Sequence, residues 1–143
     1  MLTIQFRDHA PDDLLRFAVI LARYRGQYIF CRHRERDTLE MPGGHREPGE
    51  AILDTARREL QEETGATAFT LSPVCYYSVT RPTRAQPEGG QSYGLLCLAD
   101  VTELGGIHSE IARIHLMDAL PEHMTYPEIQ PALFAECERR GLL

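Results

Sequence analysis

The sequence predicts an α/β fold in which a mixed β-sheet lies between helices, and three observations lead to it. Segments with strand character stand on both sides of an amphipathic helical segment at 50–64, and a second helical segment follows the last strand, at about 126–140. The order is strands, helix, strands, helix, without the regular alternation that builds a parallel sheet. No glycine-rich dinucleotide turn, internal repeat or linker interrupts the 143 residues, so we expect a single domain, 1–143.

A β-hairpin is predicted in the first quarter of the chain. Residues 17–23 are apolar and β-prone, the sequence RGQ at 25–27 supplies a turn, and residues 28–33 alternate large side chains with smaller or polar ones. Three later segments also have strand character: 70–80, 92–101 and a short one at 111–117. The stretch PTRAQPEGG at 82–90 is rich in turn-forming residues and is expected to be a surface loop.

The two helices are predicted from composition and spacing. Residues 50–64 are good helix formers, and this helix is expected to stop at Gly65, which tolerates the left-handed conformation found at helix ends. Apolar residues recur along one side, so that the helix can pack on a sheet: Ile52, Leu53, Ala56 and Leu60. The second helix, at about 126–140, has Pro127 at its start and Gly141 beyond its end.

The charge balance restricts the ligands that the protein can attract. The chain carries 15 basic and 21 acidic residues, a net charge of -6, which argues against nonspecific attraction to a nucleic-acid backbone. A strongly anionic ligand would therefore need metal ions or local arginines. Every basic residue is an arginine, so Schiff-base chemistry by lysine and the lysine of a phosphate-binding P-loop are both excluded.

The cysteines and the apolar runs indicate where the protein resides. The four cysteines have no C-x-x-C pair and no histidine at a zinc-like spacing: Cys31, Cys75, Cys97 and Cys137. We therefore expect a reduced, cytoplasmic protein in which these residues are small buried hydrophobic side chains. The longest apolar run, residues 17–22, is too short for a membrane span, and no signal peptide is expected.

Three glutamates concentrate at the end of the first predicted helix. Glu59, Glu62 and Glu63 stand at i, i+3 and i+4, so their side chains share one side of the helix. Like charges at this spacing repel one another, and the macrodipole at a helix C-terminus disfavours anions. Hard cations such as magnesium would relieve the repulsion, because they bind carboxylate oxygens and bridge to phosphates. Function therefore explains the spacing better than helix stability does, and Glu62 and Glu63 are expected to be exposed.

The cluster belongs to a longer pattern. An isolated ExxEE would most simply be a solvated acidic face, relieved here by Arg58 four residues before Glu62. Residues 44–66 instead follow the pattern G-x5-E-x7-R-E-U-x-E-E-x-G-U, in which U is aliphatic. The required positions are filled by Gly44, Glu50, Arg58, Glu59, Leu60, Glu62, Glu63 and Gly65, with Ala66 as a small last U. The pattern resembles the Nudix box, and eight matches at fixed spacing argue against accident.

Similarity to the Nudix hydrolase family (MutT-like) implies a loop-helix-loop on an α/β/α sandwich, with the glutamates at the mouth of a substrate cleft. The resemblance assigns binding of Mg²⁺, with Mn²⁺ as an alternative, to Glu59, Glu62, Glu63 and the backbone carbonyl of Gly43. Glu59 and Glu63 are also candidates for deprotonating the attacking water. Arg58 is expected to orient a neighbouring carboxylate through a charge-assisted hydrogen bond.

The resemblance also implies supporting roles for other acidic residues near the three glutamates. Glu50 is expected to pin the loop and not to touch metal. Glu110 lies just before the 111–117 strand, where many Nudix enzymes have an additional acidic ligand or base, and Glu103 is a poorer candidate. A simple surface glutamate is the competing interpretation for both, since acids in loops are common.

Arginine and tyrosine offer weaker signals. A hairpin would let one or two arginines of the run 32–36 (RHRER) reach phosphate oxygens, although a solvated loop is the simpler interpretation. Five tyrosines are candidate faces for stacking a nucleobase, none of them singled out: Tyr28, Tyr76, Tyr77, Tyr93 and Tyr126. The six histidines lack metal-ligand spacing, so His45 is a variable position of the box.

The resemblance implies a hydrolase that cleaves a phosphoanhydride bond in a nucleoside diphosphate derivative. The expected substrate is a nucleoside triphosphate, ordinary or oxidised, cleaved to monophosphate and pyrophosphate. One alternative is an ADP-ribose or nucleotide-sugar pyrophosphatase, since such members often have a proline past the box and Pro82 lies there only approximately. Another is a non-catalytic nucleotide-binding sensor, which a complete box disfavours. The expected partners are small nucleotides, with no nucleic acid and no membrane, and homodimers are common in the family.

Overall fold

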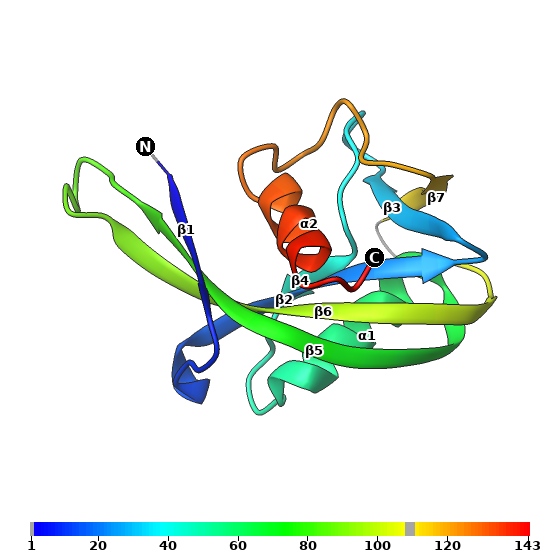
Figure 1. Ribbon diagram of the computed structural model, residues 1–143, viewed down its shortest axis with the longest axis horizontal. Coiled ribbons are helices and arrows are strands. Elements are labelled where there is room, and N and C mark those ends of the chain that lie inside the picture. The colour runs from blue at the N-terminus through cyan, green and yellow to red at the C-terminus, as the bar shows by residue number, and fades with distance from the viewer. Residues whose placement is uncertain (1, 108–110) are drawn as a thin grey trace.

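The computed structural model describes residues 2–107 and 111–143, which form a sheet with a helix on each face (Figure 1). The helices are α1 (Ile52–Thr64) and α2 (Gln130–Arg139). The strands are β1 (Thr3–Arg7), β2 (Leu15–Tyr24), β3 (Gln27–His33), β4 (Gly43–His45), β5 (Ala66–Arg81), β6 (Gly90–Leu104) and β7 (Ile111–Met117). A short 3-10 turn, η1 (Asp12–Leu14), joins β1 to β2.

The sheet is mixed, which confirms the predicted α/β sandwich. Its strand order is β1-β5-β6-β2-β3-β7, and β4 pairs with β2. β2 and β6 run parallel, whereas the other paired strands run antiparallel. Because β2 pairs with β3, β4 and β6, it lies in the middle of the sheet. The chain leaves this central position through β4 and then enters α1.

Each face of the sheet carries its own hydrophobic cluster. On the α1 face, the helix residues predicted to face the sheet do so: Ile52, Ala56 and Leu60 are buried, and Leu53 is partly buried against them. On the α2 face, Leu133 is buried with its neighbours. Removing this apolar area from water is what holds both helices to the sheet. This packing fixes α1 in space, together with the glutamates of its C-terminal half.

The predicted hairpin is confirmed, and the strands extend beyond their predicted limits. β2 turns into β3 through Arg25 and Gly26, both at positive φ (51° and 81°), with Tyr24 paired to Gln27. β5 and β6 are longer than predicted because they pair with each other along nearly their whole length. Neither β1 nor β4 was predicted. β1 forms by pairing with the longer strand β5, and β4 forms by pairing with the longer strand β2.

The helix α1 begins two residues later than predicted. It starts at Ile52 because Ala51, at its N-terminal boundary, has an extended backbone with φ -71° and ψ 145°. It ends as predicted at Gly65, whose φ of 76° is left-handed. The position of Ala51 leaves Glu50 in the preceding loop, where its side chain contacts the helix from outside.

The helix α2 begins at Gln130, later than the predicted start at 126. The N–H groups of Ile129 and Gln130 both donate to the carbonyl oxygen of Tyr126, at 3.2 and 3.0 Å, so these residues form a turn before the helix. Pro127 lies in that turn, and Pro131 is the proline of the first helical turn, where a missing N–H costs nothing. The predicted helix start was therefore wrong by about one turn.

All four cysteines are free and buried, as predicted. Burial raises the pKa of the Cys31 thiol well above its usual value, and it also raises the pKa of Cys97 to about 12. These thiols therefore behave as hydrophobic side chains and not as nucleophiles. Neither α1 nor α2, the helices of the described residues, combines the length and the apolar character that crossing a bilayer requires.

Candidate active site

The loop that leads into α1 is held against the centre of the sheet. In β4, Gly43 pairs with Val19 and Gly44 pairs with Ala18 of β2. A Cβ at Gly43 would lie 2.5 Å from the carbonyl oxygen of Ala18, and a Cβ at Gly44 would lie 2.4 Å from the carboxyl carbon of Glu59. A side chain at Gly43 would separate the loop from the sheet, because backbone obstructs it, whereas a side chain at Gly44 would displace the Glu59 carboxylate.

Glu50 joins this loop to α1. Its Oε1 accepts hydrogen bonds from the Thr55 hydroxyl at 2.6 Å and from the Glu47 N–H at 3.2 Å, and its Oε2 accepts one from Arg58 Nε at 2.8 Å. The hydrogen bonds from Arg58 and Thr55 lower the pKa of Glu50 to about 2. Glu50 thus stays ionised and makes the contacts expected of a residue that pins the loop.

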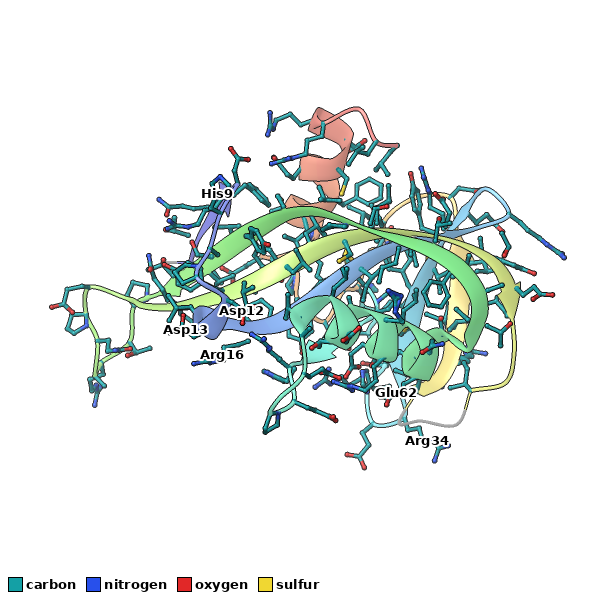
Figure 2. All side chains as sticks on the ribbon, turned by 90° about the horizontal axis from the view of Figure 1, so that it is seen from below. His9, Asp12, Asp13, Arg16, Arg34 and Glu62 are labelled. Carbon is teal, nitrogen blue, oxygen red and sulfur yellow. The ribbon has the colours of Figure 1, made fainter. Side chains whose placement is uncertain are left out.

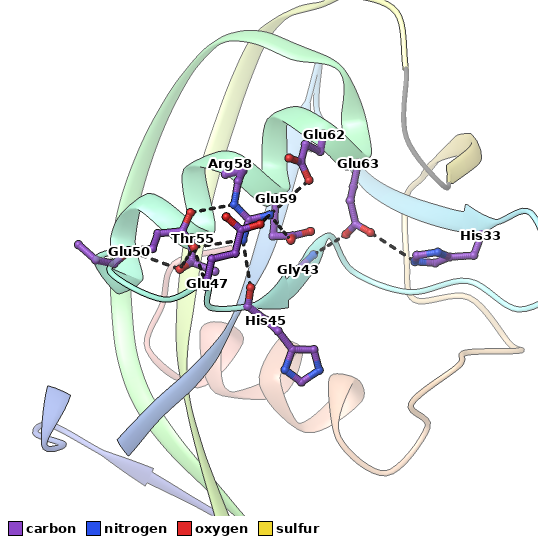
Figure 3. Close-up of polar contacts among 11 residues, drawn as sticks. His33, Gly43, His45, Glu47, Glu50, Thr55, Arg58, Glu59, Glu62 and Glu63 are labelled. Atoms are coloured by element: carbon purple, nitrogen blue, oxygen red, sulfur yellow. Dashed lines mark hydrogen bonds and ion pairs between the residues drawn. The ribbon is translucent and has the colours of Figure 1, made fainter. Parts of the chain in front are cut away.

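Arg58 lies at the centre of the box and contacts several of its acidic groups (Figure 3). Besides Glu50, it donates to Glu59 at 2.7 Å and to Glu62 at 3.3 Å, and to the backbone carbonyl of His45 at 3.0 Å. The hydrogen bond to Glu50 is the largest of the effects that raise the pKa of Arg58. A planar guanidinium with several donors is suited to such multiple contacts. Arg58 therefore orients two of the predicted metal-binding carboxylates.

Glu63 is buried, with 6% of its surface exposed, which overturns the prediction that it is exposed. The backbone N–H of Gly43 donates to its Oε1 at 2.8 Å, and His33 Nε2 lies 3.3 Å from its Oε2. Burial raises the pKa of Glu63 to about 8, and the negative charges of Glu59, Glu40 and Glu62 add to the effect. A nearby cation would offset both effects and would stabilise the ionised form of Glu63.

The three glutamates of the cluster share one side of α1 but differ in exposure (Figure 3). Glu59 is 13% exposed at its side chain, and burial raises its pKa. Glu62 is 51% exposed, as predicted, and points outward from α1 (Figure 2). The cluster therefore runs from a buried carboxylate at Glu63 to a solvated one at Glu62.

The donor set fits a hard divalent cation. Carboxylate oxygens are the preferred ligands of such ions, and the mutual repulsion of the three glutamates is a cost that a cation would remove. In the described part of the chain, however, no three acidic, histidine or cysteine side chains converge as a ready-made metal site. Arg58 occupies oxygens of Glu59 and Glu62, and the Gly43 N–H occupies one of Glu63. Cation binding would have to share or replace these hydrogen bonds.

Two contacts of the cluster were not predicted from the sequence. His33, at the end of β3, lies between Glu63 and Glu40, which is itself buried. In the run 32–36 only the arginines were predicted to have a role, because the position of His33 in the sequence matches no metal-ligand spacing. Glu110 lies outside the described residues, and Glu103 is exposed near the end of β6, paired with Ala68 of β5.

A pocket of about 240 Å³ opens beside the glycine loop. Gly43 and Gly44 form part of its wall, so the pocket adjoins the carboxylate cluster. The other lining residues are mostly apolar or aromatic: Phe17, Val19, Met41, Tyr77, Val79 and Ile129, with Glu40, His45, Tyr126 and Gln130 as polar members. Two of the five candidate tyrosines thus reach the pocket. Tyr77 is 1% exposed and packs on Phe17, whereas Tyr126 is 40% exposed.

The side chain of Gln130 is fixed at the pocket. Its Oε1 accepts a hydrogen bond of 2.7 Å from the backbone N–H of Met41, and the residue is 3% exposed. Because an N–H can donate only to the oxygen, this contact settles which way the amide points. The amide NH₂ does not take part in this contact, and Gln130 is one of the polar residues that line the pocket.

The chain matches known proteins in sequence. The NUDIX domain matches residues 14–134. YtkD of Bacillus subtilis, provisionally named an 8-oxo-dGTP diphosphatase, is 33% identical over 76 residues, which are 53% of this chain and 48% of YtkD. A second Bacillus subtilis protein with the same provisional name is 30% identical over 93 residues, 62% of this chain and 60% of that protein. The matched segments span about half the length of these relatives.

Solved structures share the fold. The Bacillus subtilis pyrophosphohydrolase BsRppH superposes with a TM-score of 0.78, covering 98% of this chain and 91% of that one at 22% identity. At this identity the similarity concerns the fold alone. The family match, by contrast, covers most of the chain and includes the whole box at 44–66. The chain therefore belongs to the Nudix family.

Proposed function

We propose that this protein is a hydrolase that converts a nucleoside triphosphate, ordinary or oxidised, to the monophosphate and pyrophosphate, with Mg²⁺ or Mn²⁺ as its cation. One observation carries the proposal: the pocket and the carboxylate cluster share Gly43 and Gly44 as a common wall. A base bound in the pocket would leave its phosphates beside Glu59 and Glu63. Substrate and cation would therefore meet at the loop that the box builds.

The pocket is suited to part of a nucleotide and not to the whole. Sites for drug-sized ligands enclose about 300–1,000 Å³, so about 240 Å³ holds a ring system whose charged tail stays outside. The rings of Phe17 and Tyr77 and the neighbouring aliphatic side chains offer a surface for a flat base. The Gln130 amide would donate to an acceptor on the base edge, which gives the pocket a means of selecting among bases.

Glu59, Glu62 and Glu63 are the residues that would hold the cation, with the Gly43 carbonyl as a further ligand. When bound, a divalent cation neutralises phosphate oxygens and lowers the pKa of a coordinated water. The net charge of -6 supports this proposal, because an acidic protein otherwise repels a polyphosphate.

The side chains of the site would position the reacting groups and accept a proton. Glu59 or Glu63 would accept the proton of the attacking water, and the raised pKa of each suits a group that must take up a proton. Arg58 would keep Glu59 in place through its hydrogen bond of 2.7 Å. Water then displaces one phosphate from the other, and no covalent intermediate with the protein is required.

The names of relatives support nucleotide pyrophosphatase chemistry but leave other substrates open. Both curated relatives bear the name 8-oxo-dGTP diphosphatase, and BsRppH is a pyrophosphohydrolase. Within the same chemistry, an ADP-ribose or nucleotide-sugar pyrophosphatase is the second candidate. A small pocket with its fixed side-chain donor favours the simple triphosphate, since a sugar nucleotide must place a second group beyond the diphosphate.

A product analysis tests the proposal. The purified protein is incubated with nucleoside triphosphates, oxidised triphosphates, nucleotide sugars and dinucleoside polyphosphates, each with Mg²⁺, Mn²⁺ or excess chelator. We expect monophosphate and pyrophosphate from at least one triphosphate, and no turnover with chelator. Faster cleavage of nucleotide sugars would favour the second candidate. Thermal stabilisation by nucleotides without any hydrolysis would instead indicate a sensor.

A further inference from the structure

His33 stands between two buried carboxylates that come from different parts of the chain. Its Nε2 lies 3.3 Å from Oε2 of Glu63 on α1 and 3.6 Å from Oε2 of Glu40 (Figure 3 shows the contact with Glu63). The exposed fractions of the three side chains are 21% for His33, 8% for Glu63 and 7% for Glu40. The imidazole is therefore the group that links the most buried carboxylate of the cluster to the pocket wall.

The backbone aims His33 at α1. The pairing of β3 with β7 shifts register between Arg32 and His33, and such irregularities re-aim side chains next to functional sites. Two residues earlier on the same strand, the Cys31 thiol contacts the backbone carbonyl of Glu63 at 3.5 Å, so this face of β3 packs on the end of α1. The N–H groups of Cys31 and Glu40 each donate to the other's carbonyl oxygen, at 2.7 and 3.0 Å, which places Glu40 beside β3.

The contacts define what the imidazole does. A carboxylate that binds a cation must be ionised, and a nitrogen that faces two carboxylate oxygens must carry a hydrogen. In the ionised, cation-binding form of Glu63, the nearer of the two carboxylates, His33 Nε2–H would therefore be its donor. Glu40 Oε2 lies farther from the same Nε2, at 3.6 Å, and Glu40 Oε1 accepts a hydrogen bond of 3.0 Å from Arg36. Glu40 thus adds a second, weaker electrostatic attraction for that N–H.

Both oxygens of Glu63 then have one protein donor each. The Gly43 N–H donates to Oε1, and His33 Nε2–H would donate to Oε2 from 3.3 Å, which would fix the plane of the carboxylate. Each carboxylate oxygen has two acceptor sites, so one on each oxygen stays available for a cation. A carboxylate that is already oriented loses less entropy when it binds metal, and partners of metal ligands act in this way.

We propose that His33 is a positioning residue of this enzyme: through its Nε2–H it orients the ionised Glu63 carboxylate for cation binding. The proposal rests on the proposed function in one respect, because Glu63 matters here as a ligand of the divalent cation. The hydrogen bond, and not the bulk of the ring, carries the effect.

Three variants separate the hydrogen bond from simple packing. Glutamine can place its amide nitrogen near the position of Nε2, asparagine is too short to do so, and leucine has no donor. Mn²⁺ binding to the nucleotide-free protein is measured by electron paramagnetic resonance at fixed pH, alongside thermal unfolding and, separately, kcat and KM. His115→Leu is the matched control, because His115 lies opposite Phe30 in the same strand pair and is half-buried, away from the cluster.

We expect His33→Leu and His33→Asn to weaken Mn²⁺ binding by about 10- to 100-fold, the range found when partners of metal ligands are removed. His33→Gln should recover most of the affinity, and His115→Leu should match the wild type. In turnover assays with saturating Mn²⁺, kcat should fall in the first two variants, while KM for the nucleotide changes little, since His33 does not line the pocket.

Two results would overturn the proposal. Mn²⁺ affinity within twofold of the wild type in His33→Leu would show that Glu63 needs no help from His33. Equal losses in His33→Gln and His33→Leu would show that the donor is irrelevant. If His33→Leu does not fold, the comparison of Gln with Asn makes the same distinction. Failure of the proposed function would appear differently, as Mn²⁺ binding by the wild type without hydrolysis of any nucleotide.

Discussion

The carboxylate of Glu59 lies directly against the Cα of Gly44. A Cβ built on Gly44 would stand 2.4 Å from the carboxyl carbon of Glu59 and 2.5 and 2.6 Å from its two oxygens. Real Cβ atoms do not approach so closely, so the glutamate occupies the space that a side chain would fill. The glycine that opens the box is therefore required by the position of a glutamate on the following helix.

Replacing Gly44 with alanine should displace the Glu59 carboxylate while the fold survives. The obstructing atoms are the end of a flexible side chain, and Gly44 is not at positive φ. A misplacement of about 1 Å near reacting groups can cost about 100-fold in rate, so we expect kcat to fall about 10- to 100-fold with little change in Tm. Steady-state kinetics and thermal unfolding measure both quantities.

Gly26→Ala is the control for that variant. Gly26 has a φ of 81° in the β2–β3 turn, and nothing lies within 4 Å of its Cβ position. The strained backbone should cost about 1 kcal/mol of unfolding free energy, whereas kcat should stay at the wild-type value. A Gly44→Ala enzyme with undiminished kcat would show that the contact with Glu59 has no catalytic importance.

Glu62→Gln and Glu63→Gln should each lower kcat, by about 100- to 10,000-fold if a ligand or base is lost. Each variant should be about as stable as the wild type, but the reason differs between the two. Glu62 is 51% exposed, and exposed substitutions change stability by about 0.5 kcal/mol or less. Glu63 is buried in a place that disfavours its charge, so a neutral residue of the same shape fits there. Near-normal kcat in either purified variant would refute its assignment.

Arg58→Lys should reduce both stability and activity, whereas Arg57→Lys should reduce neither. Lysine cannot reproduce the fork that contacts Glu50 and Glu59 together, so one of them loses its partner. We expect a loss of about 1–3 kcal/mol in unfolding free energy, measured in urea, and a fall in kcat of at least about tenfold. Arg57 is exposed on the same helix and serves as the charge-matched control. Equal behaviour of the two variants would rule out a specific role for Arg58.

The carboxylate cluster was predictable because its geometry is local. Residues at i, i+3 and i+4 of a helix share one side wherever that helix packs, and the apolar spacing of α1 already indicated which side faces the sheet. The burial of Glu63 was not predicted, although helix geometry places Glu63 between Ile52 and Ala56 on the buried side of α1. It depends on β3 and the Gly43 loop covering the end of α1, and charged residues are rarely buried unless partners meet them there.

The unpredicted elements also depend on contacts distant in sequence. β4 consists of Gly43, Gly44 and His45, a composition with little strand propensity, and it forms because glycine allows close approach to β2. β1 has only five residues and exists through its pairing with β5. His33 and Glu40 meet Glu63 only after β3 has packed beside α1, and no periodic pattern records such a meeting.

Glu136 on α2 should make the protein sensitive to acid. It is 5% exposed, and hydrogen bonds from Arg139 and then Arg140 lower its pKa to about 2. A folded pKa below the unfolded value of about 4.5 stabilises the fold above pH 4.5, and this stabilisation is lost as the pH falls from 4.5 towards 2. Glu136→Gln should therefore unfold about 1–3 kcal/mol more easily than the wild type at pH 7, with the difference shrinking in urea titrations at pH 3.5. The exposed Glu138→Gln is the control, and a difference independent of pH would contradict the role assigned to the ionised carboxylate.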